Sequence, residues 1–151
     1  MKRNLASIAF AAMASWAFGA ATVTDANGTL TIAVPSGEEY DLSTHAAGIA
    51  ANTWTEIVKT GPGTLNGAGS FTTTAITGPL RIREGWFYAA QRDALPNNAS
   101  AKVIVEGDAT GGGTLKTFND AGNVNLWSAT ARLFLSGTGV GGTAGALHHV
   151  G

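Results

Sequence analysis

The chain has 151 residues, with 9 Lys or Arg and 10 Asp or Glu, so its formal net charge is −1. This balance excludes a nucleic-acid binder that works through bulk electrostatics, because such a protein needs a clear cationic excess. The absence of cysteine excludes disulfides, cysteine-based zinc sites and thiol chemistry. The chain contains 21 glycines, about twice the share that is usual in a soluble protein. Charged residues make up 13% of the chain, about half of their usual share. This composition favours an exported, repetitive β-protein of one domain over a cytosolic enzyme.

Residues 1–21 have the layout of a secretory signal peptide. Two basic residues open the segment, an apolar stretch runs to Phe18, and small residues permit cleavage after Gly19 or Ala21. A membrane anchor is the alternative, but the stretch is short and rich in alanine for a bilayer span of about 20 residues. We therefore expect export, with residues 22–151 as the mature region and no stable membrane span after cleavage.

Short strand patterns dominate the mature region. Runs with alternating or β-branched side chains are bounded by Gly, Asn, Asp or Pro, which favour turns. These runs lie at 29–34, 56–59, 80–83, 85–88, 102–106, 124–127 and 132–135. Two alanine-rich stretches, 46–51 and 89–94, are too short for free-standing helices and are expected to be connections.

A Gly-Thr-Leu triplet recurs along the chain. It begins at Gly28, Gly63 and Gly113, and a Gly-Ala-Leu variant begins at Gly145. The intervals are irregular, but three of these triplets follow a β-run and a glycine turn, so each unit reads strand, glycine turn, strand. One unit cannot bury its apolar face alone, whereas parallel stacking buries a continuous row and pairs the backbone groups of neighbours. The pattern predicts an all-β fold built as a parallel β-solenoid, with an antiparallel β-sandwich as the alternative.

The segment from Ile57 to Gly67 resembles the autotransporter-associated β-strand repeat, which occurs in passenger regions of bacterial surface and secreted proteins. The core of that repeat reads Lys-x-Gly-x-Gly-Thr-Leu, and the matching residues here are Lys59, Gly61, Gly63, Thr64 and Leu65. Residues 71–74 fit the Thr-rich strand that follows the core, and residues 78–85 fit the last part of the repeat. Residues 131–151 resemble the linker that leads into a further repeat.

The resemblance implies a right-handed parallel β-helix that is exported and is secreted or associated with the bacterial outer membrane. It also implies a structural or adhesive module without catalysis or cofactor, whose partners are extracellular glycans or neighbouring cell surfaces. Full-length relatives often carry further repeats and a C-terminal β-barrel, which needs several strands of about 10 residues. Since no such strands fit here, we expect an incomplete β-helix, truncated at the C-terminus.

One mixed basic and aromatic cluster stands out as a candidate surface-binding site. Its members are Arg81, Arg83, Trp86 and Tyr88, with Phe87 and Arg92 beside them. Aromatic stacking and arginine hydrogen bonds suit a sugar or a surface. The alternative is a solvated strand face whose aromatic residues close the core.

Other motifs predict local structure rather than chemistry. Glu106, Asp108 and Asp120 are candidates for Ca²⁺ ligands or for the acids of a polysaccharide-cleaving β-helix, but Gly-Asp and Asn-Asp pairs favour turns. The adjacent pair His148 and His149 faces opposite sides of a strand and so does not chelate one ion.

A Gly-x-Gly-x-x-Gly run at 137–142 lacks the helix and acidic residue that a dinucleotide site needs. We predict no catalytic, cofactor or metal residues. A fragment of a polysaccharide-active β-helix enzyme, or a carbohydrate-binding sandwich that uses Trp86 and Tyr88, remains the alternative function.

Overall fold

The computed structural model describes residues 20–51, 53–67, 71, 78–89, 94–96, 101–118 and 132–150. Residues 1–19 of the expected signal peptide lie outside the described part of the chain. The strand predicted at 124–127 also lies outside it. The described part of the chain consists mostly of β-strands, with one short α-helix and two 3-10 turns. The predicted all-β class is therefore confirmed.

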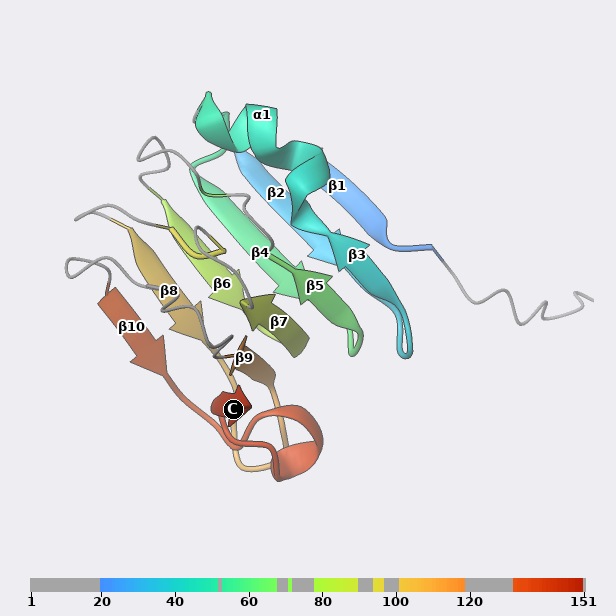
Figure 1. The fold of residues 1–151 in the computed structure, drawn as a ribbon, viewed down its shortest axis with the longest axis vertical. Helices are drawn as coiled ribbons and strands as arrows, with labels where there is room; N and C mark the ends of the chain where they lie inside the picture. Colours follow the sequence, from blue (N-terminus) through green and yellow to red (C-terminus); the bar gives the residue numbers. More distant parts are fainter. Residues whose placement is uncertain are drawn as a thin grey trace, which may run out of the picture.

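The strands form two sheets, one of six strands and one of five. The six-stranded sheet has the order β1-β2-β4-β6-β8-β10 (Figure 1). Its strands are β1 (Thr22–Ala26), β2 (Thr29–Ala33), β4 (Glu56–Thr60), β6 (Pro79–Ile82), β8 (Lys102–Val105) and β10 (Arg132–Leu135). The five-stranded sheet has the order β11-β9-β7-β5-β3. Its strands are β3 (Glu39–Asp41), β5 (Thr64–Asn66), β7 (Gly85–Ala89), β9 (Gly113–Phe118) and β11 (Leu147–Val150).

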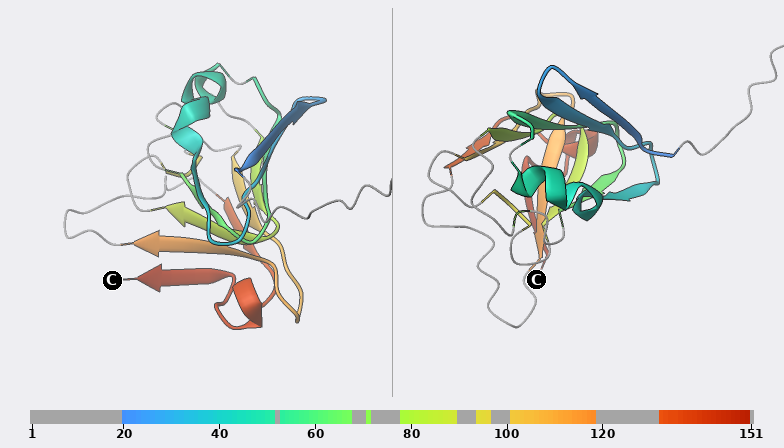
Figure 2. Two further views of the ribbon diagram at one scale, coloured as in Figure 1. Left: turned by 90° about the vertical axis from the view of Figure 1, so that its right-hand side faces the viewer. Right: turned by 90° about the horizontal axis from the view of Figure 1, so that it is seen from above.

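From β2 onward the chain alternates between the two sheets, so each strand of the larger sheet is followed by one of the smaller sheet. We call each such unit, for example β4 and β5 with their turn, a strand pair. Neighbours within a sheet are parallel, except that β1 is antiparallel to β2. Figure 2 shows β7, β9 and β11 one below the other in chain order. This parallel arrangement differs from the antiparallel β-sandwich that the sequence left as an alternative.

Apolar side chains from both sheets pack into one core. Alternation along each strand sends every second residue inward, and register aligns these residues between neighbouring strands. One inward row comes from the larger sheet and one from the smaller sheet. The first row contains Leu30, Ile57, Leu80 and Val103, and the second contains Leu65, Phe87 and Leu115, all of them at most 1% exposed.

The connections between strand pairs contribute the rest of the core. Between β3 and β4 the chain forms the 3-10 turn η1 (Leu42–His45) and the helix α1 (Ala46–Ala50), which lies beside the β1–β3 end of the sheets (Figure 1). The sequence predicted a connection at this position. Buried side chains from the connections are Leu42, Ile49, Trp54, Phe71, Ala94 and Leu95. Another 3-10 turn, η2 (Val140–Gly142), precedes β11.

Glycines shape the turn between β4 and β5. Gly61 has a φ of +74°, a left-handed conformation that side chains with a Cβ disfavour. Gly63 is needed for space instead, because a Cβ there would overlap the carbonyl oxygen of Pro35 in the preceding turn and lie 2.7 Å from that of Glu38. The turns of successive strand pairs are therefore stacked closely, which requires glycine at fixed positions.

Lys59 occupies an inward position of β4, in register with Ile32 and Ile82, and its side chain is fully buried. Its ammonium group donates hydrogen bonds to the carbonyl oxygens of Thr60 (2.8 Å), Gly61 (2.5 Å) and Glu84 (3.0 Å). A buried charge is tolerated only when such partners replace water. Lys59 therefore fills a core position with its stem and stabilises the turns with its amine.

The last strand pair leaves inward positions uncovered. Leu135 and Leu147 are 46% and 44% exposed, although they are in register with the buried residues Val105 and Leu115. In the described part of the chain, β10 and β11 are the terminal strands of their sheets. The parallel stack therefore has an open end at this side.

Candidate functional site

The structure divides the predicted cluster between the two sheets. Arg81 lies on β6, with Arg83 directly after it, whereas Trp86 and Tyr88 lie on β7. Each of these side chains alternates with buried residues and so faces outward. The turn that ends at Gly85 carries the chain from one sheet to the other, so the arginines and the aromatic residues project from the outer faces of different sheets.

The two arginines take part in an ion-pair network on the larger sheet. Arg81 Nε lies 2.8 Å from Glu56 Oε1 on β4, and its guanidinium also pairs with Glu106 after β8. Arg83 Nε lies 3.1 Å from Glu106 Oε2. Hydrogen bonds to Glu56 and then to Glu106 raise the pKa of Arg81 above its ordinary value. These contacts fix the arginines to the scaffold and join three neighbouring strands.

Trp86 and Tyr88 belong to a different group on the smaller sheet. Lys116 Nζ lies 5.1 Å from the centroid of the Tyr88 ring and 5.9 Å from that of Trp86. The ring of His148 meets Trp86 edge to face, with 5.8 Å between centroids. We call these four residues the aromatic cluster. Cation–π and edge contacts of this kind hold the aromatic rings in fixed orientations while leaving them partly exposed.

The aromatic cluster is part of two outward rows on the smaller sheet. The first row contains Asp41, Asn66, Tyr88, Lys116 and His148, and the second contains Glu39, Thr64, Trp86 and Thr114. The sequence did not connect Lys116 or His148 with Trp86, because both residues are distant from it in the chain. The signal that locates them is the repeated triplet, since each follows the leucine position of a Gly-Thr-Leu or Gly-Ala-Leu unit.

The two adjacent histidines face opposite sides of β11, as strand alternation predicts. His148 contacts Trp86, while Nδ1 of His149 lies 3.0 Å from the hydroxyl of Thr117, a buried residue of β9. Among the described residues, no group of three or more His, Cys, Asp or Glu side chains is placed to hold a metal ion.

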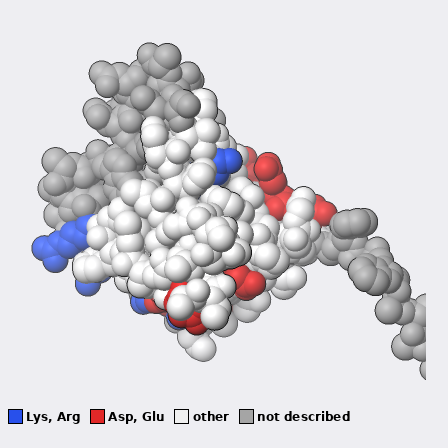
Figure 3. All heavy atoms as spheres, turned by 90° about the horizontal axis from the view of Figure 1, so that it is seen from below, with Lys and Arg blue, Asp and Glu red and all other residues white. Residues whose placement is uncertain are grey.

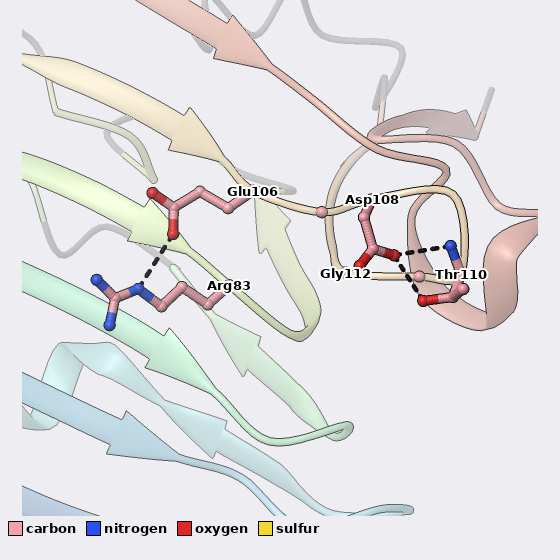
Figure 4. A pocket seen from close by; sticks show the side chains of 7 residues that line it. Arg83, Glu106, Asp108, Thr110 and Gly112 are labelled. Carbon is pink, nitrogen blue, oxygen red and sulfur yellow. Dashed lines mark hydrogen bonds and ion pairs between the residues drawn. The ribbon is translucent and has the colours of Figure 1, made fainter.

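One surface hollow, of about 520 Å³, lies at the turn between β8 and β9 (Figure 4). In Figure 4 the carboxylate of Asp108 points toward Thr110, accepting from its backbone N–H (2.7 Å) and its hydroxyl (2.6 Å). These hydrogen bonds lower the pKa of Asp108. Glu106, at the edge of the hollow, is paired with arginines. The carboxylate of Asp108 therefore stabilises a turn, and that of Glu106 pairs with arginines on the sheet. Asp120, the third candidate, lies outside the described residues.

A second groove, of about 450 Å³, runs beside Trp86. Its lining comes from the turns that precede β3 and β5, from the strands β3, β5 and β7, and from one residue of η2. The lining residues are Ser36, Gly37, Glu38, Glu39, Pro62, Gly63, Thr64, Trp86 and Val140. The volume is within the range of about 300–1,000 Å³ typical of ligand sites, and one tryptophan and two glutamates are among the lining residues.

Charged side chains are sparse on the described surface seen in Figure 3, in keeping with the low charge of the chain. Within the described ranges, no helix combines the length and apolarity needed to cross a bilayer. Comparison with known protein families, curated protein sequences and solved structures finds no match for this chain.

Proposed function

We propose that the chain is an exported structural module, secreted or displayed on a bacterial surface, whose strand pairs wind into a right-handed parallel β-helix. In this role it acts without catalysis, as a segment of a stalk whose outer face adheres to glycans or to neighbouring surfaces. The strand order supports this winding, since the chain visits the two parallel sheets in turn. Parallel crossover connections are right-handed in nearly all proteins.

The stacked inward rows are the observation that carries the proposal. Leu30, Ile57, Leu80 and Val103 are all buried in register on one sheet, and the second sheet repeats the arrangement. Each strand pair stacks in register on its neighbours, as in repeat proteins, where stability is a sum over units and their interfaces. This architecture suits a stalk, because repetition sets its length.

The open end supports a stalk that continues beyond the last strand pair. Leu135 and Leu147 occupy positions that are buried in the preceding pair. Within the described part of the chain, β10 and β11 are the last strands of their sheets, and the edge of a terminal strand is where a further strand can add. Further repeats of the same kind would cover both leucines. A full-length relative of the autotransporter type would supply such repeats, followed by a barrel.

The contact of Ala21 with the core supports signal cleavage after Gly19. Strand β1 begins at Thr22, and Ala21 packs against the core. Cleavage after Gly19 keeps Ala21 in the mature chain, whereas cleavage after Ala21 removes this contact. We therefore expect Ala20 as the mature N-terminus.

Export is tested by expressing the full chain in a Gram-negative bacterium, fractionating the cells and sequencing the N-terminus of the product. The expected result is a chain outside the cytoplasm that begins at Ala20, whereas a chain that begins at Thr22 would contradict the choice of the earlier cleavage site. A matched variant, Ile8→Glu/Phe10→Glu, interrupts the apolar stretch and should remain in the cytoplasm. An unprocessed wild-type chain in the cytoplasm would overturn the proposed role.

A further inference from the structure

We infer that the groove beside Trp86 binds a glycan chain carrying free amino groups. This inference rests on the proposed adhesive function and assigns it a site and a ligand class. The groove differs from the cluster suggested by the sequence, because it contains neither Arg81 nor Arg83.

The groove has the length and direction of an extended glycan. Its lining passes from Glu39 on β3 to Thr64 on β5 and Trp86 on β7, three residues that are in register on consecutive parallel strands. Neighbouring strands lie about 4.8 Å apart, so the groove crosses the strands and extends for roughly 10 Å. That distance matches about two sugar rings laid along the stack.

Apolar walls provide surfaces on which sugar rings can stack. Trp86 is half-buried on the outward face of β7, and its indole is held by the edge contact with His148. Pro62 and Val140 add apolar surface around the groove. Val140 is fixed in place because its backbone N–H donates to the hydroxyl of Thr114 (2.9 Å). A fixed aromatic ring loses little conformational entropy when a ligand binds to it.

The polar lining selects for hydrogen-bond donors and positive charge. Glu38 and Glu39 contribute two carboxylates, which accept hydrogen bonds but do not donate them. No arginine, lysine or histidine is among the described lining residues. Lys116 Nζ lies beside the groove, 5.9 Å from the centroid of the Trp86 ring, and is closer to Tyr88, at 5.1 Å. Protonated amino groups therefore suit this groove, and acidic glycans are repelled.

Backbone pairing favours a glycan over a peptide. The backbone N–H of Gly63 donates to Val34 (2.9 Å), that of Thr64 donates to Glu38 (2.9 Å), and that of Trp86 donates to Gly63 (3.0 Å). These three backbone N–H groups along the groove are therefore already hydrogen-bonded to backbone carbonyls. An extended peptide, by contrast, gains its affinity by pairing with the backbone of a free strand edge. Recognition here depends on stacking and on side-chain acceptors, which is how sugars are bound.

The test is calorimetric titration of the purified chain with a chitosan oligomer, at a mildly acidic pH where its amines are protonated. The fully N-acetylated oligomer of equal length, an oligogalacturonate and an oligolysine are titrated in parallel. We expect the chitosan oligomer to bind most tightly, the acetylated oligomer at least about three-fold more weakly, and the oligogalacturonate not at all. Added salt should weaken binding of the chitosan oligomer more than that of the acetylated one.

Variants connect the binding to the groove. Trp86→Ala should reduce affinity at least about ten-fold, the equivalent of about 1.4 kcal/mol. Glu38→Gln/Glu39→Gln should abolish the preference for the amino form and leave the acetylated oligomer unaffected. Phe134→Ala removes an exposed aromatic side chain from the larger sheet and serves as the control with unchanged affinity. Circular dichroism of each variant verifies that the β-structure is intact.

Equal binding of the amino and acetylated oligomers, tighter binding of the oligolysine, or no effect of Trp86→Ala would overturn the inference. These results are distinguishable from failure of the proposed function. A chain that is exported and processed as expected but binds none of the oligomers refutes the groove assignment alone, whereas a chain retained in the cytoplasm refutes the proposed role.

Discussion

The ammonium group of Lys59 donates a hydrogen bond to the backbone carbonyl of Glu84 (3.0 Å), and the carboxylate of Glu84 accepts one from the backbone N–H of Gly61 (3.1 Å). Lys59 lies on β4, close to the turn that contains Gly61, and Glu84 lies in the turn of the next strand pair, so the contacts join consecutive strand pairs. They also give a physical reason for a Lys-x-Gly pattern in a stacked β-fold. The lysine satisfies carbonyl oxygens in turns that glycine makes tight.

Replacing this lysine by an apolar side chain of similar length should destabilise the fold. Lys59→Met removes the donor to three carbonyl oxygens, and leaving buried acceptors unsatisfied costs about 1–3 kcal/mol. Chemical denaturation measures the change in the free energy of unfolding. Lys102→Met, at an exposed position of β8, is the control and should change that energy by less than about 0.5 kcal/mol. Equal effects of the two substitutions would contradict the role assigned to Lys59.

The same residue predicts how stability depends on pH. Burial lowers the pKa of Lys59 to about 8, and the nearby Glu84 carboxylate partly opposes this shift. The unfolded chain, with an ordinary lysine pKa of about 10.4, therefore binds more protons than the folded chain above about pH 8. Because stability rises with pH wherever the unfolded state binds more protons, the free energy of unfolding should rise by up to about 1.4 kcal/mol per pH unit in this range.

Denaturation of the wild type and Lys59→Met at several pH values isolates this effect from other titrations. The wild type should gain stability relative to the variant between about pH 8 and pH 10. The difference in the free energy of unfolding between wild type and variant could instead stay constant, or the variant could gain stability relative to the wild type. Either result would show that the folded chain does not lower the proton affinity of Lys59.

Gly63 is expected to tolerate no side chain. A Cβ at this position would overlap the Pro35 carbonyl oxygen, so Gly63→Ala should cost about 2–3 kcal/mol through backbone displacement. Gly37→Ala is the matched control in the preceding turn, where a Cβ meets nothing within 4 Å and only the φ of +79° is strained. That strain amounts to about 1 kcal/mol. In thermal unfolding, Gly63→Ala should lower the Tm more than Gly37→Ala does. A larger decrease for Gly37→Ala would contradict the close stacking of the turns.

Arg81 is expected to stabilise the larger sheet. Arg81→Met removes its partly buried ion pairs with Glu56 and Glu106 and should lower the free energy of unfolding by about 1 kcal/mol. High salt should reduce the difference from wild type, because salt screens exposed charges. Arg132→Met, at an exposed position of β10, should have little effect. Loss of glycan binding in Arg81→Met with unchanged stability would contradict this assignment.

Much of the fold follows from local patterns in the sequence. Alternation in Leu80–Arg83 and the β-branched run at 102–106 locate β6 and β8 to within about two residues, because burial on one face imposes the period of two. The strand β3 was not predicted, since Glu39–Asp41 is only three residues long and carries two charges. It is formed by parallel pairing with β5, a contact that no local pattern encodes.

The candidate site was harder to predict than the strands. Alternation indicates correctly that Arg81 and Trp86 face outward, but it does not reveal that the turn between them changes the sheet. Charged residues usually lie on a solvated face. The sequence therefore offered no reason to expect that Lys59 is buried. Its acceptor Glu84 lies in the next strand pair, and the groove likewise joins Glu39 to Trp86 across strands that only the register brings together.

The parallel stacking of strand pairs is tested most directly by cross-linking in a chain that has no cysteine of its own. Tyr88 and Lys116 are in register on β7 and β9, whereas Thr114 is in register with Trp86. Disulfides need Cα atoms within about 4.4–6.8 Å, and parallel neighbours satisfy this at about 4.8 Å. Mild oxidation should therefore cross-link Tyr88→Cys/Lys116→Cys efficiently and Tyr88→Cys/Thr114→Cys poorly. Preferential cross-linking of the second variant would contradict the parallel register and the β-helix that we propose on its basis.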